Sequence, residues 1–95
     1  MRYITYCSFA NSNGCLGVVI LDGDLDVIEA AKEAHRLNLN PGGQVLAVSC
    51  SETDSDVPGW LFEAMWNNKN RLITSDEARV LFDAIPIKEH NGSLN

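Results

Sequence analysis

The turn Asn38-Leu39-Asn40-Pro41-Gly42-Gly43 is the first candidate for a binding site, because glycine-rich turns present backbone amides that can hold anions. A phosphate-binding glycine loop precedes a helix N-terminus, where free amides and the helix dipole favour negative charge. Here the glycines follow the expected end of a helix, and the chain contains neither G-x-x-x-x-G-K-[ST] nor G-x-G-x-x-G. We therefore favour a structural turn. The alternative is a ligand site shared by two turns, with these candidate residues: Asn11, Asn13, Gly14, Asn38, Asn40, Gly42 and Gly43.

The acidic side chains are a second candidate for a functional site, in this case for binding a cation. Asp22, Asp24, Asp26 and Glu33 follow the spacing of a calcium-binding loop, but Val27 occupies the position that requires glycine. A looser cation site shared with the acidic loop 52–56 stays open, since clustered carboxylates repel one another unless something neutralises them. The simpler interpretation is a solvated acidic surface, and we assign no metal ligand and no cofactor.

Nucleophilic catalysis has little support in the sequence. Cys50 and His35 are the one pair that could act as nucleophile and base. However, His35 falls in the middle of a predicted helix and Cys50 closes an apolar strand, which is typical of a structural cysteine. We predict a non-enzymatic protein with no catalytic residues.

Aromatic residues suggest a contact surface. Phe62 and Trp66 are one helical turn apart, and Trp60 lies on the same predicted helix. This apolar segment is typical of a core helix that covers a sheet. The alternative is a patch that binds a partner protein or a second copy, because Trp is enriched at binding hot spots. The candidate partner-binding residues are Trp60, Phe62 and Trp66, with Asp22, Asp54 and Asp56 from the acidic loops.

These residues must be positioned by a small number of elements. Alternating aromatic and β-branched residues predict strands over 2–10, 15–21 and 44–50. Apolar residues at helical spacing predict a helix over 25–37, with Asp24 as N-cap. A shorter helix is expected over 58–66. A final helix should begin after Thr74, whose capping box is completed by Glu77, and end near Phe82 or Ala84. Residues 88–95 read as a flexible tail.

The order of these elements predicts one small α+β domain over residues 1–95. A hairpin, a helical crossover and a third strand give a three-stranded, mostly antiparallel sheet in the order 2-1-3, with C-terminal helices. If Asn13-Gly14 forms the hairpin turn, Phe9 lies opposite Val18, and Cys7 lies opposite Ile20. The first helix should cover one face of the sheet, and residues 60–82 should cover the other. The two acidic loops should then meet at one end and the two glycine-rich turns at the opposite end.

Composition limits the partners. Thirteen acidic against seven basic residues give a net charge of −6, which disfavours direct binding to nucleic acid. The longest apolar run, residues 15–21, is too short to span a membrane, and the first residues lack the apolar run of a signal peptide. Three cysteines cannot all pair within one chain. We therefore expect a cytoplasmic protein.

Four segments taken together resemble a group of short bacterial and phage proteins for which no activity is assigned. The matching pieces are YCSFANSNGCLGVVI, the helix that follows it, LNPGGQVLAV and NRLITSDEA. The resemblance implies a bacterial cell or an infected host cell, and it implies no chemistry. From the residues we expect a small acidic protein that binds a host or partner protein, as an inhibitor or accessory factor. The alternative is a small-molecule or nucleotide binder that uses the turns at 10–14 and 38–43.

Overall fold

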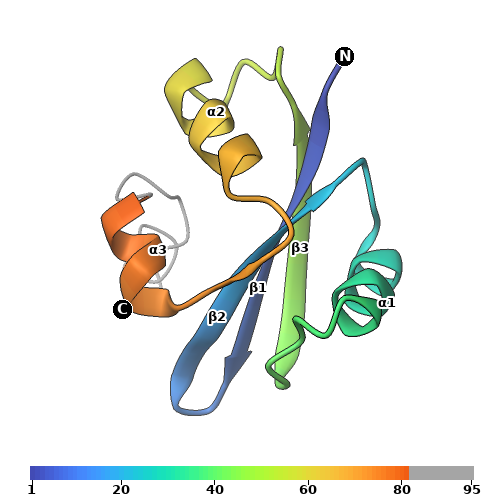
Figure 1. Cartoon of the computed structure of the whole chain (residues 1–95), viewed down its shortest axis with the longest axis vertical. Helices are drawn as coiled ribbons and strands as arrows, with labels where there is room; N and C mark the ends of the chain where they lie inside the picture. The colour runs from blue at the N-terminus through green and yellow to red at the C-terminus, as the bar shows by residue number, and fades with distance from the viewer. Residues whose placement is uncertain (82–95) are drawn as a thin grey trace.

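The computed structural model describes residues 1–81, which form an antiparallel sheet covered by helices on both faces (Figure 1). The elements in chain order are β1 (Tyr3–Asn11), β2 (Gly14–Asp22), α1 (Val27–Arg36), β3 (Gln44–Ser51), α2 (Gly59–Asn67), β4 (Leu72–Ile73) and α3 (Ser75–Leu81). The predicted end of the last helix near Phe82 or Ala84 and the predicted flexible tail 88–95 lie outside the described residues.

The sheet has the strand order β3-β1-β2-β4. The predicted order 2-1-3 is confirmed for the first three strands, and each neighbouring pair is antiparallel. The prediction of only three strands is wrong, because β4 pairs with the outer edge of β2 through Val18–Ile73 and Val19–Leu72. A strand of two residues is too short to show the alternation of apolar and polar residues by which strands are predicted, so β4 could not be recognised in the sequence.

The hairpin register differs from the predicted one by one residue along most of the strands. Cys7 lies opposite Val19, and Phe9 lies opposite Gly17. The turn residues are Ser12 and Asn13, followed by Gly14 with a φ of 124°, and the register shifts again between Phe9 and Ala10. Because side chains alternate between faces, a shift of one residue moves a strand's whole apolar set to the other side.

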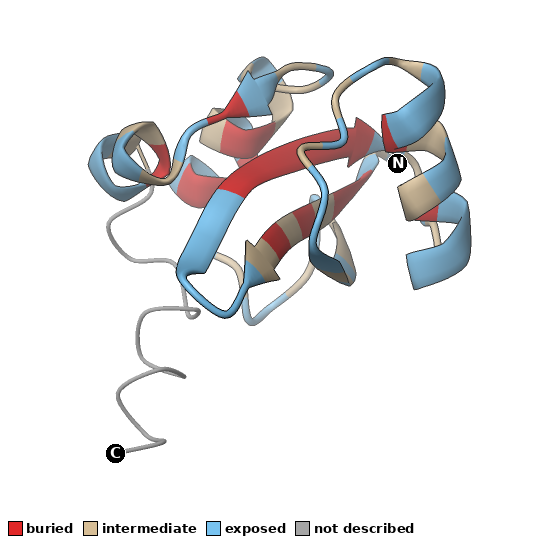
Figure 2. Ribbon diagram, turned by 90° about the horizontal axis from the view of Figure 1, so that it is seen from below, coloured by how far each residue is buried: buried red, intermediate tan, exposed pale blue. Residues whose placement is uncertain are grey.

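That shift decides which helix covers which residues. On one face, α1 contributes Ala30 and Ala34 to a core with Cys7, Phe9, Val19 and Leu21. On the other face, α2 and α3 pack on Ile4, Val18, Ile20 and Ile73. The prediction that both faces need covering, one by the first helix and one by the C-terminal half, is confirmed. Figure 2 shows the buried residues concentrated along the central strands.

Helix α1 begins two residues later than predicted. Asp26, not Asp24, is the N-cap: its carboxylate accepts from the Glu29 backbone amide at 2.8 Å, and Glu29 accepts from the Asp26 amide at 3.0 Å. This reciprocal pair is a capping box, which satisfies two otherwise unpaired amides. In α3 the predicted cap Thr74 does accept from the Glu77 amide, at 3.1 Å.

Candidate functional site: the open edge of β3

Strand β3 lies at the edge of the sheet and pairs on one side only, with β1. The sequence Gln-Val-Leu-Ala-Val-Ser-Cys-Ser forms a strand because its β-branched and apolar residues suit a pleated surface. Its eight residues pair with β1 without interruption from Tyr3–Ser51 to Ala10–Gln44. Within residues 1–81, the backbone groups of β3 that point away from β1 make one backbone hydrogen bond, in which the Ser51 carbonyl accepts from the Asp54 amide. This edge is therefore a row of unpaired donors and acceptors.

The side chains of β3 are also poorly covered. None of its eight residues is buried, whereas β1 and β2 supply half of the buried hydrophobic core. Leu46 and Val48 are each 60% exposed. They pair with Ser8 and Tyr6 of β1 and lie on the same face of the sheet as Cys50, which packs against the α2 and α3 core. The helices thus cover the β1 and β2 part of this face and leave the Leu46–Val48 part open.

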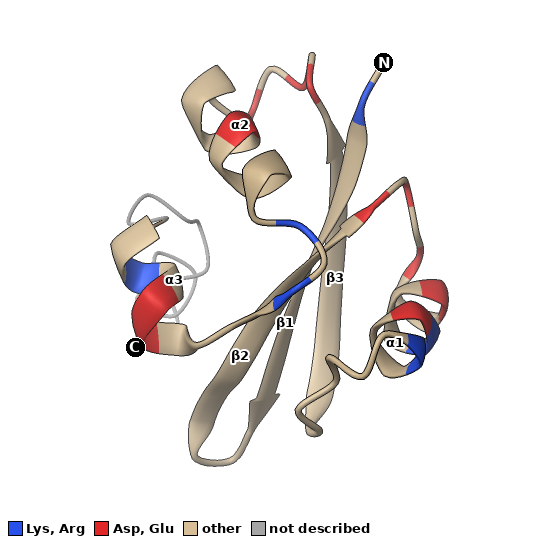
Figure 3. Ribbon diagram, viewed as in Figure 1, with Lys and Arg blue, Asp and Glu red and all other residues tan. Residues whose placement is uncertain are grey.

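The other edge of the sheet is different. β4 is two residues long and covers part of β2, and the Asn70 amide donates to the Ile20 carbonyl at 2.8 Å. Natural proteins protect sheet edges with short strands, Lys, Pro or bulges. Strand β3 has none of these devices, since Gln44–Ser51 contains no charged residue and no proline (Figure 3).

The two glycine-rich turns lie at one end of the sheet, as predicted, because Gln44 pairs with Ala10 beside the hairpin (Figure 1). Their amides are partly occupied by their own side chains. Asn11 Oδ1 accepts from the Asn13 amide at 2.8 Å, and Asn40 Oδ1 accepts from the Gly42 amide at 2.7 Å. Such bonds stabilise turns locally.

Conformation explains the glycines without a ligand. Gly42 and Gly43 have φ values of 94° and 79°, which residues with a side chain rarely adopt. A Cβ on Gly43 would come within 2.4 Å of the Ala10 carbonyl oxygen. Asn38 ends α1 with a φ of 60°, as Asn does at helix ends.

The acidic residues of the loops that follow β2 and β3 lie at the opposite end of the sheet, as predicted (Figure 3). Several of them have internal partners. Asp22 pairs with Lys69 at 3.3 Å, and Glu52 pairs with Arg2, whose guanidinium lowers the pKa of that carboxyl below its usual range. Asp54 Oδ1 accepts from the exposed Asp56 amide at 2.9 Å. Within residues 1–81, no group of three or more His, Cys, Asp or Glu side chains is arranged to hold a metal ion.

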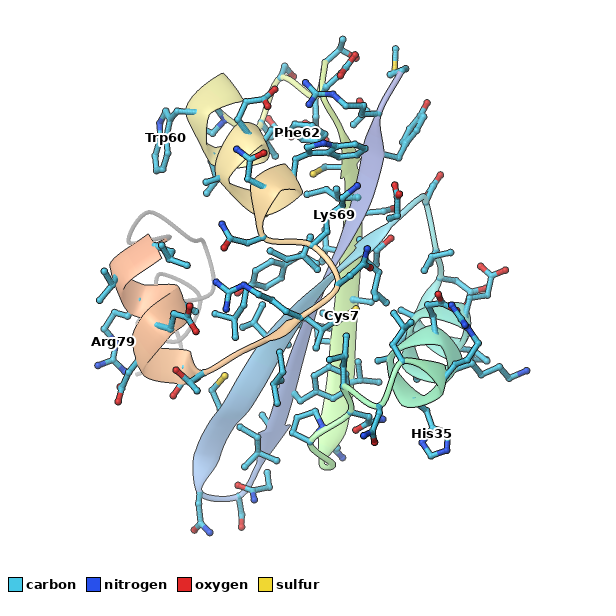
Figure 4. All side chains as sticks on the ribbon, viewed as in Figure 1. Cys7, His35, Trp60, Phe62, Lys69 and Arg79 are labelled. Carbon is cyan, nitrogen blue, oxygen red and sulfur yellow. The ribbon has the colours of Figure 1, made fainter. Side chains whose placement is uncertain are left out.

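The predicted aromatic surface is divided between core and exterior (Figure 4). Phe62 is 1% exposed and belongs to the core, so it offers no contact surface. Trp66 stacks on Phe62 with ring centroids 6.1 Å apart, and its ring lies 5.0 Å from the Arg2 guanidinium and 3.3 Å from Lys69 Nζ. Two cations therefore hold Trp66 against the fold. Trp60 alone remains outward, with 54% of its surface exposed.

Cys50 and His35 belong to opposite sides of the sheet. Cys50 packs with the core under α2 and α3, whereas His35 is exposed on α1, which covers the other face. Two effects raise the pKa of the Cys50 thiol: burial, which contributes more, and the nearby Asp54 carboxylate. The geometry therefore gives no nucleophile and base pair at these positions.

No helix within residues 1–81 combines the length and apolar character needed to cross a lipid bilayer. Comparison of the chain with protein-family models, with curated proteins and with solved structures found no match. The fold and the edge of β3 are therefore the basis for a functional proposal, and the bacterial or phage setting stays a prediction.

Part of this site is visible in the sequence itself. The predicted order 2-1-3 already places the third strand at an edge, and the absence of charge in QVLAVSC is visible in the sequence. Only the structure reveals that the neighbouring helices leave Leu46 and Val48 uncovered.

Proposed function

We propose that this protein acts by binding another protein, and that the open edge of β3 with its outer face is the contact surface. The observation that carries the proposal is the combination of an edge strand whose outward backbone groups are unpaired up to the Ser51 carbonyl with two side chains, Leu46 and Val48, that are 60% exposed. An added strand gains backbone hydrogen bonds along the edge and apolar contacts from alternate side chains.

An exposed, uncharged edge strand is a template for pairing with other chains, and proteins usually block it. Retaining such an edge is a liability unless a partner covers it. The alternative prediction, a small molecule held by the turns at 10–14 and 38–43, receives less support, because side chains within those turns occupy two of their amides.

The resemblance to bacterial and phage proteins suggests where the partner is found. We propose that the partner is a protein of the bacterial or infected cell cytoplasm, and that binding serves an inhibitory or accessory role. The net charge of −6 suits a basic partner surface better than an acidic one.

The test compares capture of a partner from a bacterial lysate by the parent protein and by Val48→Lys. A lysine in the middle of the edge should abolish capture, because a charge there opposes strand pairing. Val80→Lys on α3 is the matched control, since Val80 is 82% exposed and lies outside β3. Both variants should keep the parent's melting temperature. Equal capture by the parent and Val48→Lys would refute β3 as the contact surface.

A further inference from the structure

The charges beside β3 indicate what kind of segment its edge would accept. Asp24 lies against the strand on the α1 side, where its Oδ1 accepts from Ser49 Oγ at 2.6 Å. Asp54 lies in the turn that follows the strand, where its amide donates to the Ser51 carbonyl at 3.1 Å and its Oδ1 accepts from the Asp56 amide at 2.9 Å. Two carboxylates therefore lie beside the last residues of β3, one against the strand and one in the turn that follows it.

These two carboxylates differ from Asp22 and Glu52, the acidic residues at the ends of β2 and β3. Asp22 and Glu52 are in ion pairs with Lys69 and Arg2, whereas neither Asp24 nor Asp54 makes an ion pair within residues 1–81. At the other end of the strand, residues 42–44 are Gly-Gly-Gln and carry no charge. The edge thus has a neutral beginning, an apolar centre at Leu46 and Val48, and an acidic end.

A second copy of this chain would match that pattern poorly. An antiparallel β3–β3 pair would place the acidic end of one copy opposite the neutral Gly-Gly-Gln end of the other. Because β3 contains no cation, the acidic end would have no charged partner in such a pair. Each copy also has a net charge of −6, which opposes self-association. An extended segment that supplies its own cations fits the charges better.

We propose that β3 binds an extended basic–apolar peptide segment of a partner protein, antiparallel to the strand. The segment has Lys or Arg near its N-terminal end, beside Asp24 and Asp54, followed by alternating apolar residues that contact Leu46 and Val48. Antiparallel pairing is the orientation that β3 already adopts with β1, and it is slightly more stable per residue than parallel pairing. An eight-residue strand accommodates a segment about 27 Å long. This inference rests on the proposed function.

The test uses three synthetic ten-residue peptides with the same alternating Val and Thr core. One carries two Lys at its N-terminal end, the second carries them at its C-terminal end, and the third carries Glu at the N-terminal end. Binding is measured by fluorescence anisotropy, and β3 amides are followed by NMR. The first peptide should bind about tenfold more tightly than the second, which is the change expected from two charge-assisted contacts, and the third should not bind.

Two variants of the full-length chain connect the peptide result to the residues. Asp24→Asn with Asp54→Asn should bind the first two peptides equally, while Asp76→Asn on α3 should keep the tenfold preference. Equal affinity of the parent for the first two peptides would overturn the proposal, as would concentration-dependent dimers by sedimentation that protect β3 amides. If no peptide binds but Val48→Lys still loses lysate capture, the inference about the peptide is wrong and the proposed function survives.

Discussion

The turn that ends in Gly43 offers a sharp test of whether its glycines serve the fold. Gly42 and Gly43 are neighbours with similar positive φ values, 94° and 79°, but their surroundings differ. A Cβ on Gly42 meets nothing within 4 Å, whereas a Cβ on Gly43 lies 2.4 Å from the Ala10 carbonyl oxygen and 3.0 Å from Leu16 Cδ1. Gly42→Ala therefore reports backbone strain alone, and Gly43→Ala reports strain plus a steric clash.

The expected magnitudes follow from these distances. A non-glycine residue at positive φ costs about 1 kcal/mol, which is the whole effect expected for Gly42→Ala. In Gly43→Ala the clash is with backbone, so Ala10 must move by at least the difference between 2.4 Å and the 3.0 Å below which real Cβ contacts essentially never fall. That movement disturbs the pairing of Ala10 with Gln44, and each hydrogen bond lost costs about 1 kcal/mol. We expect a total of about 2–4 kcal/mol for Gly43→Ala.

Urea unfolding at equilibrium measures both variants against the parent. The midpoint should fall in the order parent, Gly42→Ala, Gly43→Ala, with an unchanged slope. Equal stability of the two variants would refute the steric reasoning. Parental stability in both, combined with loss of a small-molecule ligand found by thermal shift, would instead establish the turn as a binding site.

Three further predictions concern charge, thiols and the aromatic cluster. Arg2 lowers the pKa of Glu52, so the stability that this pair contributes is present above the unfolded pKa of the carboxyl and is lost as pH falls through its folded pKa. In acid unfolding, the stability of Glu52→Gln should therefore depend less steeply on pH than that of the parent. Burial raises the pKa of Cys7 to about 11, so iodoacetamide should label the exposed Cys15 in the native protein and react with Cys7 only on unfolding. Equal labelling rates of Cys7 and Cys15 in the native protein would show that Cys7 is not buried in the sheet. Trp66→Ala should leave a folded protein that is less stable by about 2–3 kcal/mol in urea, because the ring is only partly buried, and an unchanged midpoint would contradict the cation contacts.

Local sequence signals were sufficient for most elements. The alternating residues of β1 and β3, the apolar stripe of α1 and the cap at Thr74 all predict the observed elements to within about two residues. These features depend on interactions between residues close in the chain, so short windows of sequence contain them. The predicted positions of the glycine-rich and acidic ends followed from the strand order alone.

The hairpin register, in contrast, was predicted wrongly by one residue. Asn13-Gly14 is a strong turn signal, but the chain turns at Ser12-Asn13 and places Gly14 after the turn. Both registers bury apolar residues on both faces, so hydrophobic pattern did not choose between them. The choice came from packing: Val19 and Leu21 contact the small residues Ala30 and Ala34 of α1, while Val18 and Ile20 pack beside Phe62.

The sequence by itself determined every element except β4, the α+β class, the central position of β1 and the meeting of the two acidic loops at one end of the sheet. Tertiary structure alone decided which aromatic residues are buried, how Trp66 is enclosed by Arg2 and Lys69, and that Leu46 and Val48 stay uncovered. The reason is that exposure of a side chain depends on where helices distant in the sequence come to rest. A strand's own residues show that it can pair on both sides, but only the assembled sheet shows which side is left without a partner.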